Sequence, residues 1–160
     1  MKKISIFIAT GFGSGYLPVI PGTFGTIVGA LISILLYYIF GNKFPMANAI
    51  LFAATLFPAM YLSGKAEIHF GEKDASQIVI DEMSGFWLSI LFHPFSFTLM
   101  IAAFLLFRFF DILKPYPICS IQKIRGGLGV VADDLVAAIY VNLILIALRY
   151  QANYTGVHIL

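Results

Sequence analysis

Apolar residues in this chain gather in five stretches that are separated by short polar, glycine-containing or proline-containing segments. The stretches cover about residues 24–40, 45–62, 78–92, 95–110 and 131–148. Each has roughly 15–18 residues, at or just below the length of a membrane-spanning helix, so some are expected to tilt or to enter a bilayer only partway. The pattern predicts an all-α protein, a compact bundle of about five to six helices that is integral to a membrane and forms a single domain over residues 1–160.

The breaks between the stretches contain residues that end or begin helices. Residues 41–43 (Gly-Asn-Lys) end the first stretch, Pro45 opens the second, and residues 93–94 (His-Pro) separate the third from the fourth. Residues 63–77 form the only long polar interval after the second stretch. We expect a loop there.

Composition supports the membrane assignment. The chain is 60% hydrophobic, 16% aromatic and only 11% charged, with a mean hydropathy of +0.93. Soluble domains average about 25% charged residues, so these figures argue against an ordinary water-soluble domain and exclude intrinsic disorder. A net charge of +2 with scattered basic residues gives no footprint for nucleic acid. The lone Cys119 excludes a disulfide framework, a cysteine-based zinc site and a redox pair.

The basic residues are distributed unevenly along the chain. If all five stretches cross with the N-terminus inside, seven basic residues lie on the inner side, two on the outer side, and Arg108 within the fourth stretch. The inner residues are Lys2, Lys3, Lys65, Lys73, Lys114, Lys123 and Arg125, and the outer ones are Lys43 and Arg149. The positive-inside rule therefore favours an inner N-terminus.

Five of the eight acidic residues lie at the edges of apolar stretches, where a carboxylate is costly unless it is paired or binds a metal. They are Asp81, Glu82, Asp111, Asp133 and Asp134, and on the orientation above all lie near inner ends. Because acidic residues from three separate segments are expected near the same membrane face, the sequence predicts that they share one site. Carboxylates without a matching set of His or Cys ligands suit Mg²⁺ or Mn²⁺ better than Zn²⁺.

A structural explanation is also open for these acids. Acids in the first turn of a helix are favoured by its dipole, which alone could account for the pairs at 81–82 and 133–134. It fails for Asp111, which would lie at the C-terminal end of a helix. Arg108 and Lys114, each three residues away, could pair with Asp111 in a structural ion cluster.

Two glycine-rich segments precede apolar stretches. Residues 10–26 match neither a dinucleotide fingerprint nor a P-loop, yet glycines followed by a helix N-terminus can bind phosphate through backbone amides. A re-entrant turn built from small residues is an equally good explanation. Residues 124–129 repeat the arrangement and add the cation Arg125.

Taken together, these segments resemble the phosphatidylglycerophosphatase A family of bacterial phospholipid synthesis. The resemblance lies in four blocks that occur in the family's order over about residues 11–138, and the blocks are Gly11–Gly15 with Pro18 and Pro21–Gly25, Asp81–Trp87, Phe107–Ile118, and Gly126–Asp134. The resemblance implies an all-helical fold and magnesium-dependent removal of the terminal phosphate from phosphatidylglycerol phosphate, which gives phosphatidylglycerol and inorganic phosphate.

The residue analysis and the resemblance converge on metal-assisted hydrolysis of a phosphate monoester. We expect the five edge acids to be catalytic and to supply most of the Mg²⁺ ligands, with one carboxylate that is free of metal acting as general base. We expect phosphate oxygens to contact Lys114 with Arg108 or Arg125, and the backbone around Gly22 and Gly25 with Thr23.

The expected partner is a phospholipid in the bacterial inner membrane, reached from the cytoplasmic face. A small membrane transporter or ion-binding protein could use the same acids, although it would favour acids at the bilayer midplane and internal symmetry, and no internal repeat is visible. A purely structural or assembly role is a third alternative. The number of metal ions, the oligomeric state and the identity of the base stay open at this point.

Overall fold

The computed structural model describes residues 2–155, and over this part of the chain the protein is helical without a strand. The helices are α1 (Lys2–Ala9), α2 (Pro21–Phe40), α3 (Phe44–Phe70), α4 (Ile80–Ser89), α5 (Phe97–Leu113), α6 (Ile118–Ile121) and α7 (Gly127–Thr155). Short 3₁₀ turns at Ser14–Tyr16 and Gly41–Lys43 precede α2 and α3. The all-α prediction is confirmed, and each of the five apolar stretches contains the greater part of one helix.

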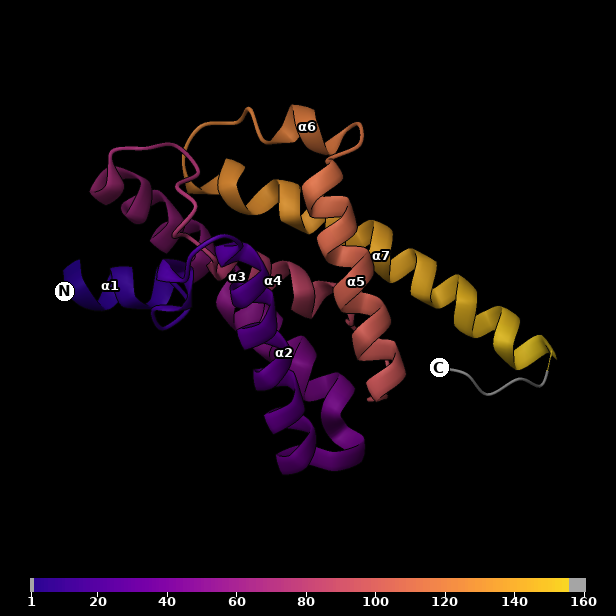
Figure 1. Cartoon of the computed structure of the whole chain (residues 1–160). Coiled ribbons are helices and arrows are strands. Elements are labelled where there is room, and N and C mark those ends of the chain that lie inside the picture. Colours follow the sequence, from indigo (N-terminus) through magenta and orange to yellow (C-terminus); the bar gives the residue numbers. More distant parts are fainter. Residues whose placement is uncertain (1, 156–160) are drawn as a thin grey trace.

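The short helix α4 lies in the middle of the bundle, in contact with α2, α3, α5 and α7 (Figure 1). Eight of its ten residues are buried. Close approach depends on glycines, because a side chain at Gly25 of α2 would meet Val79, and one at Gly85 would meet the Phe107 ring of α5. The Trp87 indole N–H of α4 donates to the Gly29 carbonyl of α2 at 3.0 Å, which fixes the two helices side by side.

The predicted loop at residues 63–77 is only partly correct. Helix α3 continues to Phe70, so that the loop between α3 and α4 begins at Gly71. The helix extends because this part of it buries the small residues Ser63 and Ala66, while its charged residues face outward. Gly71 then ends the helix in the left-handed conformation (φ 70°) and donates to the Glu67 carbonyl.

Helix lengths limit how the chain can lie in a membrane. The continuous segment Pro21–Phe70, which contains α2 and α3, and the segment Gly127–Tyr154 of α7 are long and apolar enough to cross. Helix α4 has ten residues, about 15 Å, and cannot cross a hydrocarbon core of about 30 Å. The third stretch is therefore one of those that can enter a bilayer only partway, and the count of basic residues that assumed five crossings does not apply to it. Integral membrane association stays a prediction from composition, which these helices support.

Candidate functional site

Segments that are far apart in sequence meet at one end of α4 and enclose a cavity of about 320 Å³. The loop before α2, the loop before α4, the first turn of α4, the last turn of α5 and the second turn of α7 all contribute to it. The predicted site residues that line it are Gly22, Thr23, Asp81, Glu82, Arg108, Asp111, Lys114, Asp133 and Asp134. The expected convergence of all five edge acids is therefore present in the structure.

Three of these acids lie close enough together to hold a metal ion. One carboxylate oxygen from each of Asp81, Glu82 and Asp134 lies within 4.8 Å of the others. Asp81 Oδ1, Glu82 Oε2 and Asp134 Oδ2 are also buried without a hydrogen-bond partner among the described residues. Oxygen ligands of this kind fit a hard divalent cation such as Mg²⁺, which would satisfy all three.

The raised pKa values of two carboxyl groups on α4 also favour a bound cation. Burial, followed by the charge of the neighbouring Glu82, raises the pKa of the Asp81 carboxyl well above its ordinary value. Burial likewise raises the pKa of the Glu82 carboxyl to about 7. Carboxylates this close in a dry site cannot all ionise without a positive charge between them.

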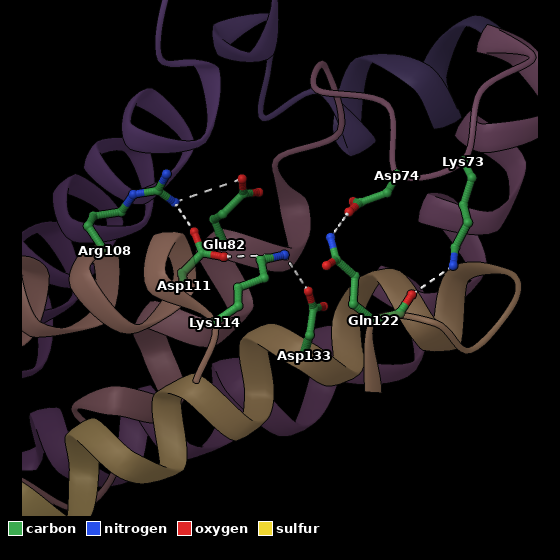
Figure 2. A network of polar contacts seen from close by, with 8 residues as sticks. All are labelled: Lys73, Asp74, Glu82, Arg108, Asp111, Lys114, Gln122 and Asp133. Atoms are coloured by element: carbon green, nitrogen blue, oxygen red, sulfur yellow. Dashed lines mark hydrogen bonds and ion pairs between the residues drawn. The ribbon is translucent and has the colours of Figure 1, made fainter. Parts of the chain in front are cut away.

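The other two acids face side-chain cations instead (Figure 2). Asp111 accepts a hydrogen bond from Arg108 Nη1 at 2.6 Å, and Asp133 accepts one from Lys114 Nζ at 2.6 Å. Longer contacts of 3.9 Å join Arg108 to Glu82 and Lys114 to Asp111. Negative and positive side chains therefore alternate across the cavity in the order Glu82, Arg108, Asp111, Lys114 and Asp133. The ion cluster considered as an alternative for Asp111 thus exists beside the acidic group.

Lys114 reaches this network because it ends α5 in the left-handed conformation, with φ of 43°. Burial alone would lower the pKa of its ammonium group. The hydrogen bond and the negative charge of Asp133 outweigh burial and raise the pKa above its ordinary value. Lys114 is therefore positively charged at any physiological pH.

The first turn of α2 supplies the uncharged side of the cavity. A side chain at Gly22 would meet the Glu82 carboxylate and the Arg108 guanidinium, so only glycine lets the turn approach them. The N–H groups of Thr23 and Phe24 donate to the Ile20 carbonyl. The Gly22 N–H has no acceptor within the described residues, which leaves it available to an anion at the helix N-terminus.

Two predicted phosphate contacts lie elsewhere. Gly25 is absent from the cavity lining and packs against Val79, so its small size serves the contact between α2 and the start of α4. Arg125 is exposed and lines a different hollow, with Glu67 and Glu72. Of the cations considered for phosphate, the cavity contains Arg108 and Lys114.

Sequence reasoning missed Asp74, an acid of the loop before α4 that also lines the cavity. Gln122 holds it there by donating from Nε2 to Asp74 Oδ2 at 2.8 Å, and Lys73 Nζ donates to the Gln122 carbonyl at 2.7 Å (Figure 2). The available signal was its position seven residues before Asp81 in the only long polar interval. That position allows the loop to fold back over the acids.

Comparison with known proteins agrees with this geometry. The family described as phosphatidylglycerophosphatase A matches residues 7–149. A Bacteroides thetaiotaomicron protein, provisionally named a phosphatidylinositol-3-phosphatase, is 39% identical over 92% of this chain and 96% of its own length. The phosphatidylglycerophosphatase A of Haemophilus influenzae is 37% identical over 94% of each chain. That of Escherichia coli is 31% identical over 82% of this chain and 76% of its own.

No solved structure matches the chain significantly. The family match covers residues 7–149, which include every segment that builds the cavity. The chain therefore belongs to the phosphatidylglycerophosphatase A family of phosphatases, as its four sequence blocks predicted.

Proposed function

We propose that this protein hydrolyses the terminal phosphate monoester of phosphatidylglycerol phosphate in a Mg²⁺-dependent reaction. The observation that carries the proposal is a single cavity with three buried, unpartnered carboxylate oxygens beside two side-chain cations and a helix N-terminus. Two relatives are named for this activity. The net reaction adds water to phosphorus, breaks the ester P–O bond and leaves phosphatidylglycerol and inorganic phosphate.

Asp81, Glu82 and Asp134 would hold the cation, since one carboxylate oxygen of each lies within 4.8 Å of the others. When bound, the ion supplies positive charge that neutralises phosphate oxygens and activates a water molecule. Of the five acids expected as Mg²⁺ ligands, these three are therefore the first candidates. Asp111 and Asp133 instead hold the side chains of Arg108 and Lys114 in place. Either carboxylate could also contact the metal ion through a bridging water.

Arg108 and Lys114 would bind the phosphate oxygens, Arg108 with its planar guanidinium and Lys114 as a point charge. Their carboxylate partners hold both side chains at the cavity before substrate arrives, so little reorganisation accompanies binding. The Gly22 N–H and the Thr23 side chain complete the pocket. Asp133 Oδ1, buried without a partner among the described residues, is an oxygen outside the metal group that can accept a proton from the attacking water.

The proposed location is the cytoplasmic face of the bacterial inner membrane. Lys73 and Lys123 line a hollow that shares Asp74 with the cavity, and Arg125 lines the next hollow with Lys73, so basic residues gather near the cavity as the positive-inside rule expects of a cytoplasmic face. A lipid substrate could then keep its acyl chains in the bilayer while its phosphate enters the cavity.

Phosphate release from phosphatidylglycerol phosphate by the purified protein, with and without Mg²⁺, tests the proposal. We expect Asp81→Asn, Asp111→Asn and Asp134→Asn each to lower kcat at least about 100-fold without loss of folding. Glu72→Gln, at an exposed acid outside the cavity, is the matched control and should keep its rate. EDTA should stop the reaction and Mg²⁺ should restore it. Near-normal rates in two of the three cavity variants would contradict the assignment.

A second head group is worth testing because one relative is named for phosphatidylinositol 3-phosphate. That lipid also carries a phosphate monoester, and the cavity contacts described above would bind either phosphate. We expect a higher kcat/KM on phosphatidylglycerol phosphate, measured with both lipids in the same micelles. Ion flux into proteoliposomes without phosphate release would instead favour the transporter alternative.

A further inference from the structure

Three large apolar side chains stand at the opening of this charged cavity. Val19, Ile20 and Ile112 all line it, yet Val19 is 92% exposed and Ile112 is 72% exposed. Val19 also adopts a positive φ of 77°, which is strongly disfavoured for a β-branched residue. An exposed valine held in a strained conformation beside the site indicates a contact that the isolated protein does not make.

The apolar opening continues along two helices. On α5 the exposed apolar residues follow one face at intervals of three or four positions, and they are Phe97, Ile101, Leu105, Phe109 and Ile112. On α2 a similar exposed face consists of Ile27, Leu31, Leu35 and Tyr38, and Ile20 precedes it at the cavity. The two helices are in contact, and their cavity ends are the start of α2 and the end of α5. Both apolar faces therefore lead to the same opening.

The cavity interior is charged, whereas the exposed faces of α2 and α5 next to it are apolar. The cavity interior contains Arg108 and Lys114 next to the acidic group, which suits a phosphate, whereas the helix faces below the opening carry apolar side chains. A molecule that matches both parts has a phosphate monoester at one end and long apolar chains at the other.

We propose that Ile20 and Ile112, with Val19, are specificity-determining residues that contact the first carbons of the substrate's acyl chains, and that the chains continue along the exposed faces of α2 and α5. This inference rests on the proposed function and deepens it, because it assigns the apolar part of the substrate to named residues. The occupant of this surface is the diacylglycerol part of a glycerophospholipid in the bilayer leaflet next to the cavity.

The test compares two substrates with the same phosphorylated head group, phosphatidylglycerol phosphate with two octanoyl chains and its deacylated form, which has no acyl carbons. The measured quantity is the ratio of kcat/KM for the octanoyl lipid to that for the deacylated substrate. We expect Ile112→Ser to lower this ratio about tenfold, because a serine cannot bury the same apolar surface. Ile20→Ser on the other side of the opening should lower it similarly, and Ile112→Leu should keep it.

Ile50→Ser is the matched control, since Ile50 is 63% exposed on α3 and lines no part of the cavity. It should leave the ratio within twofold of the wild type. An unchanged ratio in both Ile112→Ser and Ile20→Ser, or an equal fall in Ile50→Ser, would overturn the proposal that the acyl chains contact these residues. A wild-type protein that releases no phosphate from either substrate would instead refute the proposed function itself.

Discussion

The ion pair between Lys114 and Asp133 gives the sharpest test of how charge is arranged in the cavity. Replacing Lys114 with glutamine removes the ammonium group that Asp133 Oδ2 contacts at 2.6 Å. The Asp133 side chain is 2% exposed, so its charge would then be buried without its partner. The Asp111 carboxylate at 3.9 Å would lose a weaker contact at the same time.

Removing one partner of a buried ion pair typically costs about 3–5 kcal/mol. The Lys114 side chain is 23% exposed, so water screens part of the interaction and the lower end, about 3 kcal/mol, is expected. Asp133→Asn added to Lys114→Gln removes the orphaned charge and should restore stability to within about 1 kcal/mol of the wild type. Activity should not return, because the phosphate still lacks the lysine and the attacking water lacks the proposed base Asp133.

Unfolding of the detergent-solubilised protein can be followed by the fluorescence of Trp87, which is the single tryptophan and is buried in α4. Lys123→Gln, at an exposed lysine, is the control and should change stability by no more than about 0.5 kcal/mol. A double variant as unstable as Lys114→Gln would refute the argument that an unpaired Asp133 causes the loss.

The pH dependence of this effect has a definite sign. Because the folded pKa of Lys114 lies above the ordinary 10.5, the stability that the pair contributes is fully present below that pH. The difference between the wild type and Lys114→Gln should therefore be constant from pH 7 to 9 and should decrease only above about 10.5. A difference that already disappears by pH 8 would contradict the raised pKa.

Three further predictions concern other contacts. Gly85→Ala should destabilise the protein by about 1–3 kcal/mol in the same unfolding assay, because the added methyl group meets the Phe107 ring, and a neutral result would contradict the tight packing of α4 on α5. Asn142→Ala should cost about 1–3 kcal/mol, since its amide donates to three carbonyls at the end of α4, and an unchanged unfolding midpoint would show that water replaces it. Gln122→Ala should lower kcat/KM severalfold with little change in stability, because Asp74 is then no longer held at the cavity; full activity would exclude a role for that contact.

Five of the seven α-helices in the described residues were predictable from the chain alone, whereas the short helices α1 and α6 lie outside the five apolar stretches. Runs of apolar residues interrupted by Gly41, Pro45 and Pro94 locate α2, α3, α4, α5 and α7. Local chemistry was enough because a helix satisfies its backbone hydrogen bonds within one segment. The end of α3 was misjudged because its last turns are polar on one face only, and the buried Ser63 and Ala66 show their role only once neighbouring helices are in place.

The candidate site was likewise predictable from sequence only in part. Carboxylates at the ends of apolar stretches are expensive wherever the chain folds, so Asp81, Asp111 and Asp134 could be recognised as members of a site from sequence. Which acids keep free oxygens and which pair with cations depends on distances of a few ångströms between α4, α5 and α7, which sequence spacing does not specify. Tertiary packing alone separated the metal group from the ion pairs and brought Asp74 into the cavity. It also placed Gly25 against Val79 and Arg125 in a hollow with Glu67 and Glu72, because which surfaces meet is decided only when the helices pack together.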